Sequence, residues 1–224
     1  MCGRYTLTTK PGRLVESFGL DEPPADLAPR YNIAPSQEVA VVPNAEPRRL
    51  QWFKWGLVPG WAKDPAIGNR MINARAETVA DKPSFRAAFR SRRCLVLADG
   101  FFEWKRDGRR KTPVYIRLKS RAPFAFAGLW ETWKPSAGEP LRSCTVITTA
   151  PNELVADIHD RMPVILAPDA YAIWLSAEAP DPDVLATLLV PYPAGEMEAF
   201  AVSTLVNAPT HDQPECIEPA QPAT

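Results

Sequence analysis

Proline occurs along the whole chain, at 25 of its 224 positions. Because proline lacks a backbone N–H and interrupts helices in their interior, this distribution favours many short elements and loops over long helices. The chain is long enough to bury a sizeable core, and neither an internal repeat nor a Gly/Ser-rich linker divides it. We therefore expect one domain built from short elements.

Five segments rich in β-branched and aromatic residues predict strands. They are residues 94–104, 112–118, 124–130, 143–149 and 162–166, and residues 107–112 predict a hairpin loop between the first two. Start and stop signals predict three short helices. One is bracketed by a threonine cap, Pro11 and Gly19, one follows Ser84, and one follows Asp181 and Pro182.

This order of elements predicts an α+β domain over residues 1–207, with an antiparallel, barrel-like β core flanked by short helices. Residues 208–224 contain four prolines and little apolar content. A segment of that composition buries too little apolar surface to offset the entropy of ordering it. We therefore expect residues 208–224 to form a disordered tail.

The charges are unevenly distributed, although 26 basic and 26 acidic residues give a net charge of zero. Residues 1–121 contain 23 of the Lys and Arg residues against 12 acidic residues, and residues 122–224 contain 3 against 14. Such asymmetry indicates a nucleic-acid or anionic partner. It fits equally well two interleaved halves that neutralise each other on folding, and both interpretations stay open at this point.

The four cysteines, at positions 2, 94, 144 and 216, are too sparse for a disulfide framework and lack the paired spacing of a metal site. With only two histidines as well, we expect neither a metal nor another cofactor. No apolar run approaches the ~20 residues that cross a bilayer, and the first residues do not resemble a signal peptide. These features predict a cytoplasmic protein without a membrane segment.

Cys2 directly follows the initiator methionine, which is normally removed when the second residue is small. The chain would then begin with an α-amine and a thiol on adjacent carbons. A neutral amine condenses with an aldehyde to an imine, and the neighbouring thiol closes a five-membered thiazolidine. The amine titrates at ~7.7–8.0 and the thiol at ~8.5, so both groups are usable near neutral pH.

Several motifs follow Cys2 in order. They are MCGRYT at 1–6, RYNIAPSQ at 30–37, WGLVPGW at 55–61, NARAET at 73–78, FRAAFRSRRCLVLADGFFEW at 85–104, AGLWETW at 127–133, and TVITTAPN…IHDRMPVIL from 145 to 166. This set resembles the SOS response-associated peptidase (SRAP) family, which crosslinks to abasic sites in single-stranded DNA. The resemblance covers about residues 2–207. Leu97 stands where the family commonly has proline and Phe102 where tyrosine is usual, and neither is expected to react.

The resemblance implies catalytic roles for four residues. Cys2 would be the nucleophile toward the ring-opened aldehyde of an abasic deoxyribose, and Asn73 would orient the cysteine or the sugar. Glu103 would move protons as the imine and the ring form, and His159 would assist the acid–base steps and crosslink reversal. The pattern alone is less specific: Asn73 would belong to a solvated strand face, and Glu103 would be either exposed or functional, because an unpaired carboxylate is costly to bury.

DNA contacts are expected from the basic half of the chain. The phosphate contacts would come from arginines and the stacking surface for bases from a tryptophan, with a threonine supporting the sugar or phosphate. The candidates are Arg4, Arg75, Arg86 and also Arg90, Trp55 or Trp61, and Thr149 or its neighbour Thr148. The Arg92–Arg93 pair and residues 106–111 fit solvated surface equally well.

Three functions remain to be distinguished. The first is a monomer that crosslinks to abasic sites in single-stranded DNA, associates with the nucleoid when bound, and has strand cleavage by β-elimination as a side reaction. The second is a cysteine peptidase, self-processing or acting on other proteins, in which Cys2, His159 and Glu103 or Asn73 would form the catalytic group. The third is a non-covalent reader of single-stranded DNA. Thiazolidine chemistry needs the amine of Cys2, a peptidase needs only its thiol, and the reader needs neither.

Overall fold

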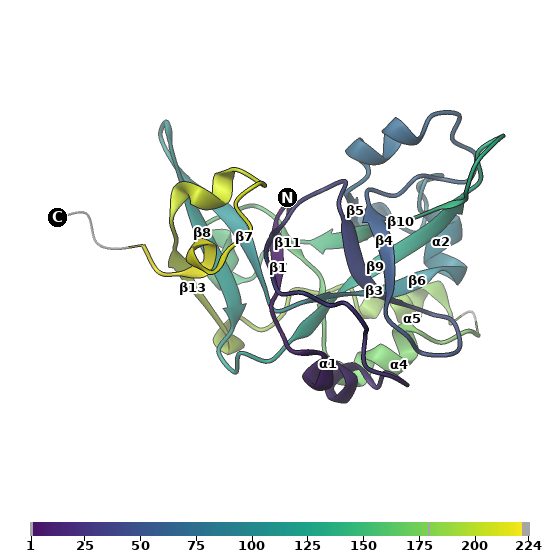
Figure 1. The fold of residues 1–224 in the computed structure, drawn as a ribbon, viewed down its shortest axis with the longest axis horizontal. Coiled ribbons are helices and arrows are strands. Elements are labelled where there is room, and N and C mark those ends of the chain that lie inside the picture. The colour runs from purple at the N-terminus through teal and green to yellow at the C-terminus, as the bar shows by residue number, and fades with distance from the viewer. Residues whose placement is uncertain (1, 179, 221–224) are drawn as a thin grey trace.

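The computed structural model describes residues 2–178 and 180–220 and arranges their strands in two sheets (Figure 1). Five strands of the larger sheet pair in a closed ring, because β10 bonds to both β9 and β4. In ring order these strands are β3 (Glu38–Pro43), β4 (Gln51–Trp55), β10 (Leu141–Thr149), β9 (Phe124–Trp133) and β6 (Arg93–Ala98). The short strands β5 (Asn73–Arg75), β11 (Met162–Pro163) and β12 (Ile165–Leu166) pair with β10 or β9.

The smaller sheet lies beside this barrel and carries the N-terminal strand. Its strands, in order, are β13 (Met197–Ala201), β8 (Arg110–Leu118), β7 (Gly100–Asp107), β1 (Tyr5–Leu7) and β2 (Arg30–Ile33). The predicted α+β class with a barrel-like β core is confirmed. Most pairings are antiparallel as predicted, but β10 runs parallel to both β4 and β5.

The predicted strand over residues 94–104 is two strands, because the chain passes from one sheet to the other at Asp99. The Asp99 carboxylate accepts hydrogen bonds from Thr6, Thr8 and Thr9, which ties this crossing to the N-terminal segment. Gly100 follows because a Cβ there would lie 2.1 Å from the Tyr115 hydroxyl oxygen. The predicted hairpin loop joins β7 to β8.

The helices are short, as the prolines predict: α1 (Pro11–Phe18), α2 (Arg86–Ser91), α3 (Glu153–Ala156), α4 (Tyr171–Trp174) and α5 (Pro182–Thr187). Helix α1 ends at Gly19 in a left-handed conformation, as predicted, but begins at Lys10 with no side-chain cap. Helix α2 begins after Phe85 rather than at a Ser84 cap, and Asp181 caps α5 as predicted. None of the helices in the described part of the chain is long and apolar enough to cross a membrane.

Arg93 is fully buried, which excludes both alternatives, DNA contact and solvated surface, for this member of the Arg92–Arg93 pair. Its guanidinium donates to the carbonyls of Phe89, Arg90, Trp174 and Ser176. It therefore binds carbonyls in the last turn of helix α2 that have no partner within the helix, and it joins that helix to α4. Four charge-assisted hydrogen bonds offset the cost of burying this side chain.

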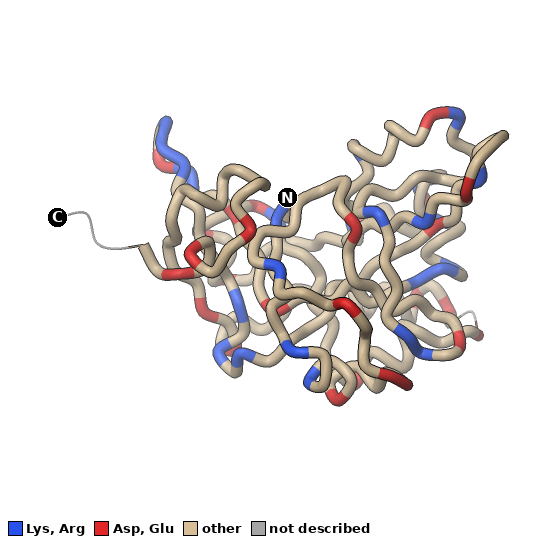
Figure 2. The backbone as a smooth tube through the Cα atoms, viewed as in Figure 1, with Lys and Arg blue, Asp and Glu red and all other residues tan. Residues whose placement is uncertain are grey.

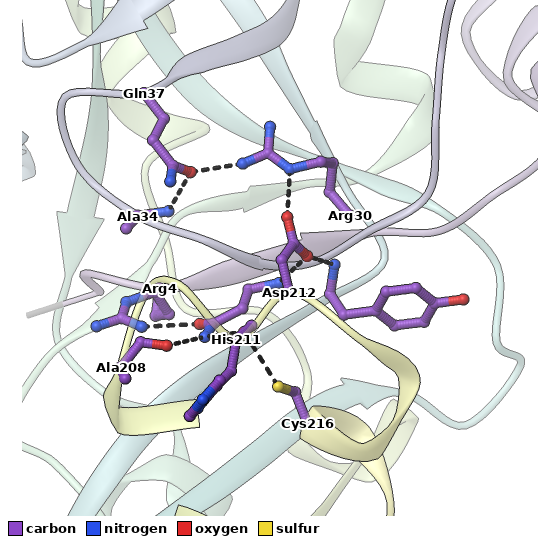
Figure 3. A network of polar contacts seen from close by, with 10 residues as sticks. Arg4, Arg30, Ala34, Gln37, Ala208, His211, Asp212 and Cys216 are labelled. Atoms are coloured by element: carbon purple, nitrogen blue, oxygen red, sulfur yellow. Dashed lines mark hydrogen bonds and ion pairs between the residues drawn. The ribbon is translucent and has the colours of Figure 1, made fainter. Parts of the chain in front are cut away.

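The prediction of a disordered tail is wrong for residues 208–220, while residues 221–224 lie outside the described part of the chain. Residues 203–219, here called the C-terminal strap, pack on the smaller sheet and include two 3₁₀ turns, Thr204–Asn207 and Pro214–Ile217 (Figure 1). The Asn32 side chain donates to the carbonyls of Ala208 and His211, and the Asp212 carboxylate accepts from the Arg30 side chain and the Asn32 backbone N–H (Figure 3). Hydrogen bonding to β2 thus orders a segment whose composition lacks an apolar signal.

Replacing Asp212 by alanine should release the strap. The change removes the acceptor of the Tyr31 and Asn32 backbone N–H groups and the ion partner of Arg30. Since a group left unsatisfied costs about 1–3 kcal/mol, we expect the free energy of unfolding to fall by about 2–3 kcal/mol and the two amides to exchange hydrogen faster. Glu215→Ala, an exposed change on the same strap, is the control; equal effects of the two variants would contradict the assignment.

Candidate active site

Cys2 lies in the segment just before β1, the strand between β7 and β2 in the smaller sheet. Tyr5 pairs with Phe101, and the Phe102 N–H donates to the Arg4 carbonyl at 2.9 Å. This antiparallel register brings the residues before Arg4 alongside Glu103. Cys2 is fully buried there, and its thiol lies 3.9 Å from the Arg4 carbonyl oxygen.

Asn73 holds the backbone of Cys2 in place. It begins β5, which is aligned by its parallel pairing with β10, and its side-chain Nδ2 donates to the Cys2 carbonyl oxygen at 2.9 Å. Strand β5 ends at Arg75, and a 3₁₀ turn, Ala76–Thr78, follows it. This direct contact supports the sequence prediction that Asn73 orients the cysteine.

Glu103 is a buried carboxylic acid in the middle of β7, cross-strand from Val114 and only 2% exposed. Burial raises its pKa to about 7 because the ionised form loses its hydration. A carboxyl group with that pKa is able both to accept and to release a proton at neutral pH. The sequence left Glu103 either exposed or functional, and the structure excludes exposure.

His159 faces Glu103 from the loop after helix α3. Its backbone N–H donates to the Val155 carbonyl, and its Nε2 atom lies 4.0 Å from the Glu103 carboxylate. The Arg161 backbone N–H donates to Nδ1, which assigns a lone pair to Nδ1 and the proton to Nε2 in the neutral ring. The Asp160 carboxylate also lies 2.9 Å from Nδ1, and its negative charge acts against the lowering of the His159 pKa.

Burial lowers the pKa of His159, which keeps the ring neutral at physiological pH. Burial also raises the pKa of the Cys2 thiol well above its usual range, and the negative charge of Glu103 adds to this shift. The site therefore holds a protonated thiol beside a carboxyl group with a pKa of about 7 and a neutral imidazole. Any reaction of this thiol as a nucleophile would have to include loss of its proton, and the charge of Glu103 acts on that proton.

Arg161 joins the two motifs that supply Asn73 and His159. Its guanidinium forms two hydrogen bonds to the Glu77 carboxylate, at 2.6 and 2.9 Å, and donates to the Thr148 carbonyl at 2.6 Å. The bond to Arg161 is the main cause of the lowered pKa of Glu77. This fork-shaped pairing fixes the 3₁₀ turn after β5 against the loop that carries His159.

A pocket of about 430 Å³ opens at Glu103 and His159. Its wall consists of side chains from β7, β8, the loop after α3 and the C-terminal strap: Glu103, Trp104, Arg106, Lys111, His159 and Asn207. The Trp104 indole donates to the Asn207 side chain at 2.7 Å, so the strap forms one side of this pocket. Two cations at the mouth suit an anionic ligand.

The predicted DNA contacts from tryptophan and threonine differ in how exposed their side chains are. Trp55 is wrong as a stacking residue, because it is fully buried, donates to the Ile72 carbonyl and packs edge-on against Tyr5. Trp61 is 61% exposed beside another pocket and stays a prediction. Thr149 is buried in β10, which leaves its predicted contact without support.

The predicted arginines do not converge on the pocket. Arg4 donates to the Asn32 side chain and the Val206 carbonyl, which gives it a structural role at the strap (Figure 3). Arg75 is exposed at the end of β5 and stays a prediction. Arg86 and Arg90 are exposed on α2, which packs on β6 and β9 and lies on the far side of the barrel from β7 (Figure 1).

Sequence reasoning missed four parts of this site: Arg106, Lys111, Arg161 and Asn207. The positive charge of residues 106–111 was compatible with DNA contact and with a solvated surface alike. Asn207 was the last residue before the predicted tail. Arg161 lies in the same quoted motif as His159, but no role was drawn from it. Within residues 2–178 and 180–220, no group of three or more His, Cys, Asp or Glu side chains is arranged to hold a metal ion.

A family model described as SOS response associated peptidase (SRAP) matches residues 1–209. The chain belongs to the SRAP family. It is 51% identical over 222 residues to the abasic site processing protein YoqW of Bacillus subtilis, which covers 97% of this chain and 99% of that protein. It is 34% identical to the abasic site processing protein HMCES of Xenopus tropicalis, over 84% of this chain and 65% of that protein.

A solved structure of a protein from Bacteroides thetaiotaomicron shares the SRAP fold of this chain. Its TM-score is 0.88 at 28% sequence identity, over 98% of this chain and 100% of that one. The resemblance drawn from the motifs is therefore confirmed, and so is the fold that it implied. In this SRAP chain Phe102 packs against Tyr115 at a ring distance of 5.0 Å, in a small apolar cluster with Val202 and Val206.

Glu103→Gln should stabilise the protein at alkaline pH. Because the folded-state pKa of Glu103 is raised to about 7, the stability linked to this group is complete below its unfolded pKa of about 4.3 and is lost as pH rises through 7. Glutamine does not ionise, so the advantage of the variant in unfolding free energy should grow by about 2–3 kcal/mol between pH 5 and pH 8.

Denaturant unfolding at the two pH values measures this difference, with Glu16→Gln on the exposed side of α1 as the control. The control should show no comparable growth. A Glu103→Gln advantage that is the same at pH 5 and pH 8 would mean that the carboxyl group has an ordinary pKa.

Proposed function

We propose that this chain reacts with abasic sites in single-stranded DNA and joins them covalently through Cys2 after removal of Met1. The names of its relatives, abasic site processing proteins, support the choice of lesion. The observation that carries the chemistry is the bond from Asn73 to the Cys2 carbonyl beside Glu103, a buried acid with a pKa near 7. The product is a stable crosslink that shields the lesion.

The reaction begins at the ring-opened aldehyde of the abasic sugar. The Cys2 amine adds to the C1′ carbonyl carbon, and the resulting hydroxyl group leaves as water after it is protonated, which gives the imine. Because the nitrogen keeps one of its own protons, this imine is protonated; the thiol sulfur then bonds to C1′ while the C=N bond becomes a single bond, and the thiol proton returns to the group that protonated the hydroxyl. Two bonds to C1′ form, one water leaves, and no oxidant or reductant is consumed.

Glu103 and His159 supply the proton transfers in this scheme. Glu103 releases a proton to the departing hydroxyl group and later takes up the thiol proton, which a pKa near 7 permits in both directions. The neutral His159, with its Nε2 proton toward Glu103, completes the relay and assists reversal of the crosslink. Holding amine, thiol and aldehyde together makes both additions intramolecular.

A side reaction follows from the same imine. The imine at C1′ acidifies the C2′ protons, so loss of one of them to Glu103 eliminates the 3′ phosphate and cleaves the strand. Closure of the thiazolidine removes the imine and ends this path. Strand cleavage should therefore increase when the thiol is absent and the amine remains.

The peptidase alternative has weaker support. A cysteine peptidase activates its nucleophile as a thiolate beside an imidazolium ion. Here burial and the charge of Glu103 raise the pKa of the Cys2 thiol, and burial lowers the pKa of His159, which opposes that ion pair. Self-processing that exposes Cys2 stays compatible with this proposal.

Intact mass under denaturing conditions tests the proposal. The protein is incubated with an oligonucleotide that contains one abasic site, and the expected product weighs the Met1-free protein plus the oligonucleotide minus one water. It should form without borohydride. Cys2→Ala should give an adduct only after borohydride reduction, and a chain with an uncleaved N-terminal extension should give none. An adduct on the extended chain, or none on the wild type while it binds the DNA, would reject the proposal.

Asn73→Ala should slow crosslinking without weakening DNA binding. The change removes the donor to the Cys2 carbonyl, and a small misplacement of a reacting group costs up to about 100-fold in rate. We expect the crosslinking rate at saturating DNA to fall about 10- to 100-fold. Asn69→Ala, an asparagine bonded to Ser36 outside the pocket, is the control. An unchanged rate with weaker affinity would instead make Asn73 a DNA-binding residue.

A further inference from the structure

The hairpin between β7 and β8 carries a concentrated positive charge. Residues 105–111, here called the basic hairpin, contain Lys105, Arg106, Arg109, Arg110 and Lys111 with a single acid, Asp107. All seven residues are exposed. The hairpin extends from the smaller sheet at the upper left of the molecule, and its tip is the blue end seen in Figure 2.

The pairing of this hairpin places like charges opposite one another. Arg106 is the direct cross-strand partner of Lys111, and Asp107 is the partner of Arg110 next to the turn. Like charges directly opposite in a strand pair are destabilising. No ion pair of the described residues involves the basic hairpin with an acid elsewhere in the fold. The chain thus keeps an unfavourable charge cluster that its own fold does not neutralise.

The basic hairpin begins inside the pocket described above. Arg106 and Lys111 line that pocket together with Glu103 and His159. Burial is the main cause of the lowered pKa of His159, and the positive charge of Arg106 lowers it further. The charge of the hairpin therefore acts on His159. From Arg106 the strand runs two residues further to the turn at Gly108, about 7 Å at ~3.3 Å per residue.

We propose that the basic hairpin binds the sugar-phosphate backbone of the single strand that leaves the pocket on one side of the lesion. This proposal rests on the proposed function and deepens it by assigning a path to the DNA. Arg106 and Lys111 contact the phosphate nearest the abasic sugar, and Arg109 and Arg110 contact the next phosphates outward. A row of cations leading out of the site suits a polyanionic strand better than a single small anion.

The test separates the tip from the pocket. Arg109→Gln/Arg110→Gln removes two charges at the tip without touching the pocket wall, and Arg48→Gln/Arg49→Gln removes two charges in the segment between β3 and β4. Affinity is measured for single strands that carry a tetrahydrofuran abasic analogue, which has no aldehyde and does not crosslink. The strands extend from the analogue in the 5′ direction, in the 3′ direction or in both.

For the tip variant we expect about 10- to 30-fold weaker binding at 0.1 M salt and a slope of log K against log salt that is less steep by about 1.4, since each phosphate contact on a single strand contributes about 0.7. The loss should appear with strands that extend in one direction only. The Arg48/Arg49 variant should bind like the wild type. An unchanged slope for the tip variant, or equal loss in both variants, would overturn the assignment.

The outcomes also distinguish this inference from the proposed function. If the wild-type protein binds the analogue with the expected slope but forms no adduct with a natural abasic site, the hairpin contact is supported and the covalent mechanism is rejected. If the wild-type protein crosslinks normally and the tip variant keeps the full salt slope, the mechanism is supported and the hairpin contact is rejected. If the wild-type protein does not bind single strands, both are rejected.

Discussion

The burial of one carboxyl group, that of Glu103, determines how the rest of the site is arranged. An ionised carboxylate in the middle of an aromatic strand is costly, so the group titrates near neutral pH instead of near 4. Burial of this group lowers the free energy of unfolding at alkaline pH. It also leaves, beside Cys2, a carboxyl group that can both accept and release a proton near neutral pH. The short strand pairing of β1 with β7, and the bond from Asn73, then place the N-terminal residue against that group.

The stability of this arrangement comes from segments far apart in the sequence. The Arg161–Glu77 pair joins the loop of His159 to the turn after Asn73, and the C-terminal strap bonds to β2 and to Arg4, two residues after Cys2. The closed barrel supplies the rigid platform on which these loops converge. Cys2, the nucleophile that we propose, would require such support, because residues near a chain end are otherwise poorly ordered.

The sequence was sufficient for the fold class and the family, and it named Asn73 and His159, which the structure places beside Cys2 and Glu103. Strand-forming segments and proline spacing predicted a barrel-like α+β domain, and the ordered motifs predicted the family. Composition failed for residues 208–220, because their order depends on hydrogen bonds that Asn32 donates to the His211 carbonyl and the Asp212 carboxylate, and on a small apolar cluster that includes Cys216. Residue type also failed to separate Trp55, which is core, from Trp61, which is exposed. Such differences depend on which segments meet in space.

The central claim is that both the amine and the thiol of Cys2 bond to one carbon of the lesion. The most direct measurement is the carbon NMR spectrum of the complex formed with an oligonucleotide that carries ¹³C at C1′ of a single abasic site. The account predicts a saturated carbon bonded to one nitrogen and one sulfur, with coupling to ¹⁵N when the protein is labelled at Cys2. An unsaturated imine carbon, or a C1′ signal without coupling to Cys2, would contradict it.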